Sequence, residues 1–468
     1  MPHSSFRSPL TERYASDEMS KIFSDQKRYS TFRKLWLELA KAQKKIGLDI
    51  SDDQISEMQA NLNDIDFQKV NEYEKKFRHD VMSHIHAFGD KCPKAKPIIH
   101  LGATSCYVTD NADLIIMKEG LNLLLSKLIK VICSLQNFAQ KEAATACIGY
   151  THFQPAQPTT IGKRACLWLQ DLLMDFQQGK NLLDSIPFLG VKGATGTQAS
   201  FLNLFDGDEQ KVKELDESVA SSFDFKKTLT ISGQTYSRKI DCLIIQFLEN
   251  IAVTTHKLAT DLRLLSHTQE ISEKFGKDQI GSSAMPYKKN PIYSERICSL
   301  ARFLISLSQN PSYTAATQWL ERSLDDSANR RISIPEAFLT ADSICNILYI
   351  VIQSLSVNYE KINSQINENL PYFCMENILM MAVKKGADRQ KVHEELRKLA
   401  QSDLKGFFKK IENRKELNLS KEDIKIACDI KNLTGRAENQ VYEFLEKEVL
   451  PVISDNQNLQ ATIPALDV

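Results

Sequence analysis

The feature that most restricts the fold of this chain is a set of long segments free of helix-breaking residues. Residues 237–270 contain neither glycine nor proline and are rich in leucine and isoleucine. Residues 111–140 repeat apolar side chains at helical spacing. A helix of about 30 residues is roughly 45 Å long. The 468 residues include only 17 glycines and 14 prolines, which indicates an all-α protein.

Apolar periodicity predicts several further helices. We expect Asp110 or Asn111 to cap the helix that begins at residue 111. Helices of this length exceed the usual mean of about 11–12 residues. They favour an extended bundle with apolar side chains on more than one face, which partner subunits usually cover, so we expect a homo-oligomer. The further helices are expected at 28–47, 69–88, 161–186, 294–309 and 332–357.

Breaks in the helical pattern divide the chain into three predicted domains. A turn-rich segment at 92–105 and the segment ENLPYF (368–373) mark the two boundaries. The predicted division is an N-terminal helical domain (1–110), a central long-helix bundle (111–364) and a C-terminal helical domain (365–468).

Composition excludes several classes of function. Lysine plus arginine and aspartate plus glutamate both number 59, so no global charge favours nucleic acid or an anionic membrane. Ten scattered cysteines form no CxxC pair, which favours a reducing compartment. We see neither a secretory signal at the N-terminus nor an apolar run of about 18 residues. These observations predict a soluble cytoplasmic protein.

Polar segments interrupt the long helices at 100–111, 149–160, 192–200, 280–291 and 321–331. Rigid helices that carry polar loops at their ends commonly build a functional site.

Each segment has a plain structural interpretation beside a functional one. Thr104 and Ser105 either cap a helix or hold a carboxylate at its start. His152 is either a structural loop residue or a general acid. The segment 280–291 is either a solvated linker or a mobile catalytic lid.

The arginines and the N-terminal histidines raise the same kind of choice. Arg322, Arg330 and Arg331 form either a basic helix face or a phosphate clamp. His84 and His86 lie two residues apart, which directs their rings to different faces of a helix, so we do not expect a metal site.

Together these segments resemble the fumarase/aspartase superfamily, over nearly the whole chain. Its three characteristic regions occur in order as GATSCYVTDN (102–111), the THFQPAQPTT and KGATGTQ region (151–198) and GSSAMPYKKNP (281–291). Within the superfamily, the chain resembles the animal-type adenylosuccinate lyase family. That resemblance is carried by SPLTERYAS (8–16), EKKFRHDVMSHIH (74–86), SGQTYSRK (232–239), LERSLDDSANRR (320–331) and LTGRAENQV (433–441).

The resemblance implies a three-domain, almost all-α homotetramer with a shared central bundle and active sites built from three subunits. It implies a carbon–nitrogen lyase of purine nucleotide biosynthesis that needs no metal or organic cofactor. The implied reactions release fumarate by β-elimination from adenylosuccinate, leaving AMP, and from the succinyl-carboxamide ribotide SAICAR, leaving AICAR.

The resemblance also implies roles for individual residues. Ser282 would be the general base, and His152 the general acid, oriented by Glu295. His79 would lie beside the site and either bind substrate or support His152. Because charge accumulates on a carboxylate during the elimination, fixed donors are needed around it. Thr104, Ser105, Lys288 and Asn290 would hold the succinyl carboxylates. Arg13, Tyr14, Arg322, Ser327 and Arg331 would hold the nucleotide and its phosphate, with Arg78, Asp80, Gln234 and Arg296 completing the pocket.

Two alternatives stay open at this point. Another lyase of the superfamily, acting on argininosuccinate, malate or aspartate, would share the elimination machinery. The arginines of 320–331 and the RYAS segment favour a phosphorylated substrate instead. A structural protein that kept the fold and lost catalysis is the second alternative, but Ser282, His152 and Lys288 are all present.

Overall fold

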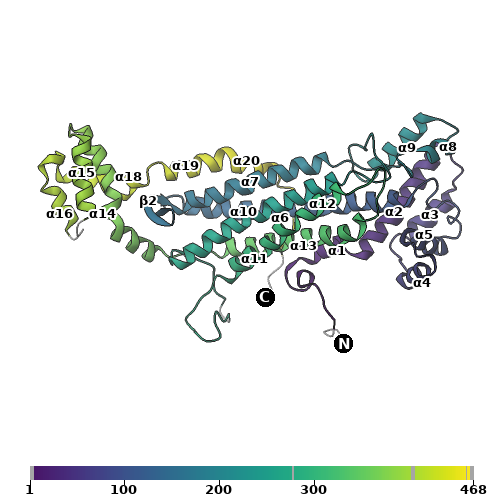
Figure 1. Ribbon diagram of the computed structural model, residues 1–468, viewed down its shortest axis with the longest axis horizontal. Helices are drawn as coiled ribbons and strands as arrows, with labels where there is room; N and C mark the ends of the chain where they lie inside the picture. The colour runs from purple at the N-terminus through teal and green to yellow at the C-terminus, as the bar shows by residue number, and fades with distance from the viewer. Residues whose placement is uncertain (1–4, 277–278, 402–405, 460, 464–468) are drawn as a thin grey trace.

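Five long helices lie side by side in one extended bundle, which confirms the prediction of a mostly helical chain (Figure 1). The computed structural model describes residues 5–276, 279–401, 406–459 and 461–463. α6 packs on α7 and α13, and α10 packs on α7, α11 and α13. These helices are α6 (Ser105–Lys141), α7 (Ile161–Ser185), α10 (Lys239–His267), α11 (Ile292–Leu307) and α13 (Asp326–Gln353).

The predicted start of α6 is wrong by six residues. The helix begins at Ser105 with Thr104 as N-cap, so neither Asp110 nor Asn111 caps it. Both are buried inside the helix instead. The Asp110 carboxylate pairs with Arg238, and the Asn111 amide donates to the carbonyl of Gly190 at 3.1 Å. Burial against partners far along the chain has overridden the local capping preference.

The N-terminal helices gather at one end of the bundle, where the longest of them, α2 (Asp25–Ile46), packs on α6 (Figure 1). The single helix predicted at 69–88 is two helices, because Arg78 adopts a left-handed φ of 52° and ends the first. His79 then caps the second, its Nδ1 accepting from the Met82 N–H at 3.3 Å. The elements are η1 (Leu10–Tyr14), α1 (Asp17–Ile22), α2 (Asp25–Ile46), α3 (Asp52–Ala60), α4 (Phe67–Phe77) and α5 (Asp80–Lys91).

Short elements connect the long helices. β1 (Ala146–Thr151) and β2 (Gln154–Thr160) form an antiparallel hairpin between α6 and α7. β3 (Ile271–Ser272) pairs with β4 (Ser356–Val357) beyond the end of α10. The remaining connecting helices are α8 (Ala199–Leu204), α9 (Glu209–Ser221) and α12 (Gln309–Ala316).

The C-terminal region begins with a helix that crosses the predicted boundary without a break. α14 (Tyr359–Lys384) continues through Pro371. Its second half, α15 and α17 share a small apolar core, whereas Val441, Leu445 and Val449 join the core of the long bundle. The other elements are α15 (Arg389–Ala400), α16 (Phe407–Glu412), η2 (Lys415–Leu417), α17 (Lys421–Ala427), α18 (Ile430–Leu433), α19 (Ala437–Phe444), η3 (Leu445–Val449) and α20 (Leu450–Asp455).

One described helix, α13, is long and apolar enough to cross a membrane, which differs from the sequence expectation. The other elements of the structure bury 78% of its most apolar window. A helix covered in this way has the character of a core helix, for which high apolarity is ordinary.

Candidate functional site

A buried network of ion pairs surrounds the first turns of α13. Arg238 donates from Nε to Asp326 and from Nη1 to Asp110, each at 2.8 Å. Arg330 donates from Nε to Asp241 at 2.7 Å and also pairs with Asp113. Because these groups neutralise one another inside the protein, Arg330 is not available as a phosphate clamp. Composition and spacing gave no sign of this network, although Arg238 belongs to the SGQTYSRK motif.

The other two arginines of the segment remain accessible. The Arg331 side chain is 55% exposed, and its Nη2 lies 3.0 Å from the Asp80 carboxylate. Arg322 lies 3.7 Å from Asp326, and Ser327 follows directly on α13. Arg78 and His79 immediately precede Asp80 in the α4–α5 junction. The structure therefore brings the predicted residues of segments 74–86 and 320–331 together.

His84 supports this junction. Among the described residues, no group of three or more His, Cys, Asp or Glu side chains is placed to hold a metal ion. The His84 ring stacks on Tyr29 with centroids 3.7 Å apart, and Nε2 lies 3.6 Å from Asp80. Burial lowers the pKa of His84 to about 4, so the ring is neutral at pH 7.

The start of α6 adjoins the Gln234 segment. The Cys106 thiol donates to Gln234 Oε1 at 3.3 Å, and Gln234 Nε2 donates to the carbonyl of Ala194 at 3.0 Å. Thr104 makes no side-chain capping bond, and both it and Ser105 are half-buried. The first turn of a 37-residue helix thus keeps donors that suit a carboxylate.

The N-terminal segment is anchored to the bundle by a buried lysine. Lys127 pairs with Asp342, both fully buried, and donates to Ser16 Oγ at 2.9 Å. Ser16 in turn donates from its backbone N–H to Asp342 at 2.7 Å. This contact places η1, which carries Arg13 and Tyr14, against α13. The Arg296 guanidinium lies 5.5 Å from the Tyr14 ring centre.

His152 stands at the tip of the β1–β2 hairpin. His152 and Phe153 have φ values of 53° and 56°, so two residues other than glycine occupy left-handed positions of a two-residue turn. Such strain costs about 1–3 kcal/mol per residue and gathers at functional sites. The His152 side chain is exposed and contacts no polar partner among the described residues. The sequence predicted a break in the helical pattern here and no hairpin; Pro155 and Pro158, which lack a backbone N–H, are unusual within strands.

Residues 279–291 project from the bundle between α10 and α11 (Figure 1). Ser282 Oγ accepts from the N–H groups of Met285 at 3.1 Å and Ala284 at 3.3 Å. Asn290 Nδ2 donates to the Gly281 carbonyl at 2.8 Å. A Cβ on Gly281 would lie 2.0 Å from the Lys288 carbonyl oxygen, so the loop needs glycine there. Lys288 itself is exposed.

These groups do not meet within one chain. The hairpin lies at the α14 end of the bundle, whereas α4 and α5 lie at the opposite end (Figure 1). No described hydrogen bond or ion pair joins His152 to Ser282, to Glu295 or to the arginines. One chain therefore holds the predicted site residues as separate clusters.

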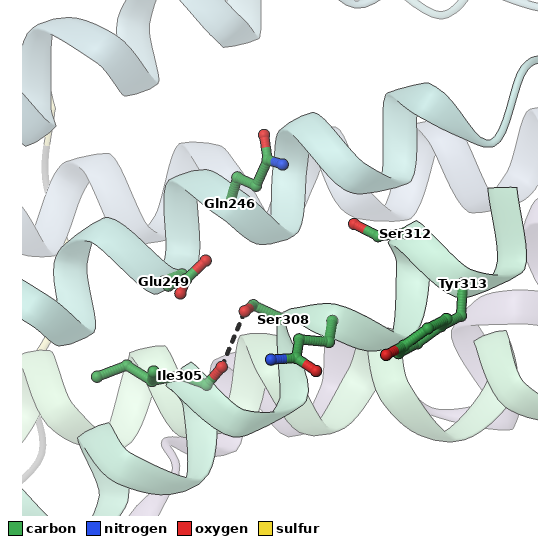
Figure 2. A pocket seen from close by; sticks show the side chains of 7 residues that line it. Gln246, Glu249, Ile305, Ser308, Ser312 and Tyr313 are labelled. Atoms are coloured by element: carbon green, nitrogen blue, oxygen red, sulfur yellow. Dashed lines mark hydrogen bonds between the residues drawn. The ribbon is translucent and has the colours of Figure 1, made fainter. Parts of the chain in front are cut away.

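Two cavities of the described chain lie apart from these clusters. One, of about 390 Å³, is a polar groove between α10, α11 and α12 (Figure 2). Gln246 and Glu249 line one side, and the Ser308 hydroxyl donates to the Ile305 carbonyl at 2.8 Å. The other, of about 430 Å³, lies between α16 and α17. Neither contains a predicted site residue.

Comparison with known proteins defines the class. The family model described as "Lyase" matches residues 12–304. The structure is similar to a fumarate lyase from Mesorhizobium sp. BNC1, with a TM-score of 0.81 and 20% identity over 93% of this chain and 99% of that one. It is equally similar to the 3-carboxy-cis,cis-muconate lactonizing enzyme of Pseudomonas putida, with a TM-score of 0.81 and 20% identity over 97% and 99%. The fold is that of the fumarase/aspartase superfamily, as predicted.

Closer relatives identify the branch. The chain is 47% identical to an adenylosuccinate lyase of Schistosoma mansoni over 96% of each protein. It is 46% identical to that of Saccharomyces cerevisiae over 96% of this chain and 95% of the relative. The model described as "Adenylosuccinate lyase C-terminus" matches residues 371–444. The chain belongs to the adenylosuccinate lyase family, which confirms the sequence resemblance.

Proposed function

We propose that the chain releases fumarate from adenylosuccinate to give AMP, and from SAICAR to give AICAR, in purine nucleotide biosynthesis. The observation that carries this proposal is near-full-length identity of 47% to a relative named adenylosuccinate lyase. The accessible Arg322 and Arg331 support a phosphorylated substrate, because a guanidinium matches the geometry of phosphate.

Ser282 is proposed to remove the proton beside the succinyl carboxylate. Serine is a weak base, so its alkoxide needs stabilisation. The N–H groups of Ala284 and Met285 already donate to Ser282 Oγ and would bind the alkoxide more strongly than the hydroxyl. Lys288, on the same loop, adds positive charge near the developing carboxylate dianion.

The donors for that dianion are proposed to be Lys288, Asn290, Thr104 and Ser105. A preorganised donor of this kind is worth about 3–4 kcal/mol in comparable sites. His152 is proposed to protonate the leaving nitrogen, with Glu295 as its orienting partner.

The nucleotide is proposed to bind around the first turns of α13. Ser327 and the two accessible arginines face the phosphate, and His79 lies beside the reacting end of the substrate. The remaining proposed contacts are Arg13, Tyr14, Arg78, Asp80, Gln234 and Arg296.

A homotetramer with shared active sites is part of the proposal. α6 separates its own first turn from the hairpin by 37 residues, or roughly 55 Å, so a single chain cannot close the site. Exposed Leu243, Val253 and Leu264 on α10 and Met174 on α7 offer apolar surface to partners. We also propose a cytoplasmic location, which ten unpaired cysteines suit.

The test is fumarate release by the purified protein, with adenylosuccinate, argininosuccinate and malate (assayed for dehydration) in parallel. Turnover of adenylosuccinate alone supports the proposal. Turnover of another substrate keeps the elimination and removes the phosphate roles of the arginines. No turnover of any substrate by a folded oligomer rejects the proposed activity.

A further inference from the structure

The N-terminus of α11 is capped from the far side of the loop that carries Ser282. Glu273 Oε1 accepts from the backbone N–H of Ser294 at 2.6 Å and from its hydroxyl at 2.5 Å. Glu273 Oε2 accepts from the Tyr293 N–H at 3.2 Å. The residue at the N-cap position, Pro291, has no side-chain oxygen to offer. Glu273 therefore does the work of a capping carboxylate from about 20 residues away.

The cap is built on a fixed support. Glu273 follows Ile271 and Ser272 in β3, which pairs with β4, and Ile271 is buried. The Glu270 carboxylate accepts from the Tyr150 hydroxyl at 2.5 Å, and its carbonyl accepts from the Asn358 N–H at 2.9 Å. Because Glu273 extends from this anchored segment, its carboxylate is a fixed point against which α11 is placed.

Contacts lead from the cap to the reacting end of the loop. The Ile292 N–H donates to the Asn290 carbonyl at 2.9 Å, just before the capped residues. Asn290 Nδ2 then holds the Gly281 carbonyl at 2.8 Å, and Ser282 is the next residue. Gly281 also packs directly on the Lys288 carbonyl. A shift in the first turn of α11 would therefore move Asn290 and, through Gly281, Ser282.

We propose that Glu273 is a positioning residue for the elimination: it caps α11 across the loop and so sets the places of Ser282, Lys288 and Asn290. The inference rests on the proposed function and adds to it a residue outside the motif GSSAMPYKKNP. Glu273 is not proposed to touch the substrate. The arginines on and before α13 do not depend on this cap, whereas Arg296 follows it on α11. Loss of the cap should therefore lower kcat more than it weakens nucleotide binding.

The experiment compares Glu273→Ala, Glu273→Gln and the control Asp388→Ala in the full-length protein. The alanine variant removes all three acceptor contacts. The glutamine variant keeps an acceptor for Ser294 but turns an N–H toward the Tyr293 N–H. Asp388 caps α15 by accepting from Gln390 and Lys391 at 2.9 and 3.1 Å, so its loss removes a comparable cap remote from the loop. The readouts are kcat and KM for adenylosuccinate, Kd for AMP, and hydrogen–deuterium exchange.

We expect kcat to fall about 10–100-fold in Glu273→Ala, the effect of a displacement near 1 Å, and less in Glu273→Gln. Kd for AMP should rise by a smaller factor than kcat falls in both variants, and exchange should rise at Tyr293, Ser294 and 279–291. Asp388→Ala should keep kcat within about twofold. If Glu273→Ala does not fold, the glutamine variant decides by the same criteria.

Three results would overturn the inference. The first is a folded Glu273→Ala variant with kcat within twofold of the wild type. The second is unchanged exchange in 279–291. The third is an equal loss of kcat and AMP affinity, which is the pattern of general damage. If the wild type itself releases no fumarate, the proposed activity has failed, and exchange alone decides whether Glu273 positions the loop.

Discussion

The two ends of the bundle hold their polar side chains in opposite ways. Around the first turns of α13, Arg238 and Arg330 are buried and paired with carboxylates on α6, α10 and α13. At the other end, His152 stands exposed on a strained turn. Among the described residues, the hydrogen bonds of the Ser282 hydroxyl are to N–H groups of its own loop.

Under the proposed function, this difference separates the residues that bind the nucleotide from the residues that transfer protons. Buried ion pairs cost several kcal/mol when one partner is removed, so they fix the backbone that presents Arg322, Ser327 and Arg331. The proposed acid and base project from the molecular surface instead. If the proposed roles hold, one chain fixes the arginines of the phosphate site by itself, whereas proton transfer requires residues of other subunits.

The largest expected effect comes from a substitution at Ser282, in the loop 279–291, that leaves the arginines unchanged. Ser282→Ala should lower kcat by about 10²–10⁴-fold, because the general base is lost. The melting temperature and AMP affinity should stay unchanged, since the Ser282 hydroxyl bonds to neighbouring N–H groups and to no distant group that the structure describes. Steady-state kinetics and calorimetry measure both, and Ser283→Ala, at the exposed neighbouring serine, is the matched control. Full activity of Ser282→Ala would remove it from the base role.

Mixed oligomers test whether the exposed end is completed by other subunits. His152→Ala and Ser282→Ala proteins should each be nearly inactive. Random exchange of equal amounts should recover about a quarter of wild-type activity, if each site takes these two residues from different chains. The measurement is fumarate release after exchange, with subunit mixing followed by differently tagged chains. Complete mixing without recovered activity contradicts shared sites.

A substitution at Arg331 should weaken substrate binding around the first turns of α13 without disturbing the loop 279–291. Arg331→Ala should raise KM for adenylosuccinate by about 10–100-fold, the equivalent of a charged hydrogen bond of roughly 1.5–3 kcal/mol, with a smaller change in kcat. Arg397→Ala is the matched control, because Arg397 is similarly exposed and paired with Glu394. The comparison is repeated with the dephosphorylated substrate. An equal effect of Arg331→Ala on both substrates would argue against a phosphate contact.

The smallest expected effect is a change in stability from Asp175, a buried residue of α7. Burial raises the pKa of Asp175 to about 7, and its Oδ2 has no partner among the described groups. The unfolded carboxyl titrates near pH 4, so the stability from the protonated form is complete below that pH and lost as pH rises through about 7. Asp175→Asn should therefore be more stable than the wild type by roughly 1–3 kcal/mol at pH 8, and by much less at pH 5. Thermal unfolding at both pH values measures this, and equal differences at the two would rule out titration of Asp175.

Much of the fold could be predicted from the sequence because apolar periodicity within each long helix is enough to identify it. Apolar periodicity placed the helices at 161–186 and 294–309 within two residues of their observed bounds. The failures fall where local preference is overruled. Arg78 breaks a helix in a left-handed conformation that arginine rarely adopts, and the β1–β2 hairpin forms in spite of two prolines.

Residues of the candidate site could be predicted where they lie in a sequence motif. They could not be predicted where their place depends on contacts between segments that are distant in the sequence. The polar breaks at Thr104, His152 and Ser282 were visible as interruptions of helices. Glu273 was not, because its partners lie about 20 residues away and its own neighbours form no motif. The sequence allowed Arg330 to be a phosphate ligand, but in the structure it is buried and paired with Asp241 and Asp113.

The length of α6 fixes the distance between Thr104 and Ser105 at its start and the hairpin with His152 beyond its end. A one-residue insertion anywhere in its 37 residues would turn everything beyond it by about 100° and lengthen it by roughly 1.5 Å. Seven inserted residues would nearly restore the facing but add about 10 Å. Small insertions and deletions should thus be tolerated in the loops around the bundle and rejected within α6, even at positions that touch no substrate.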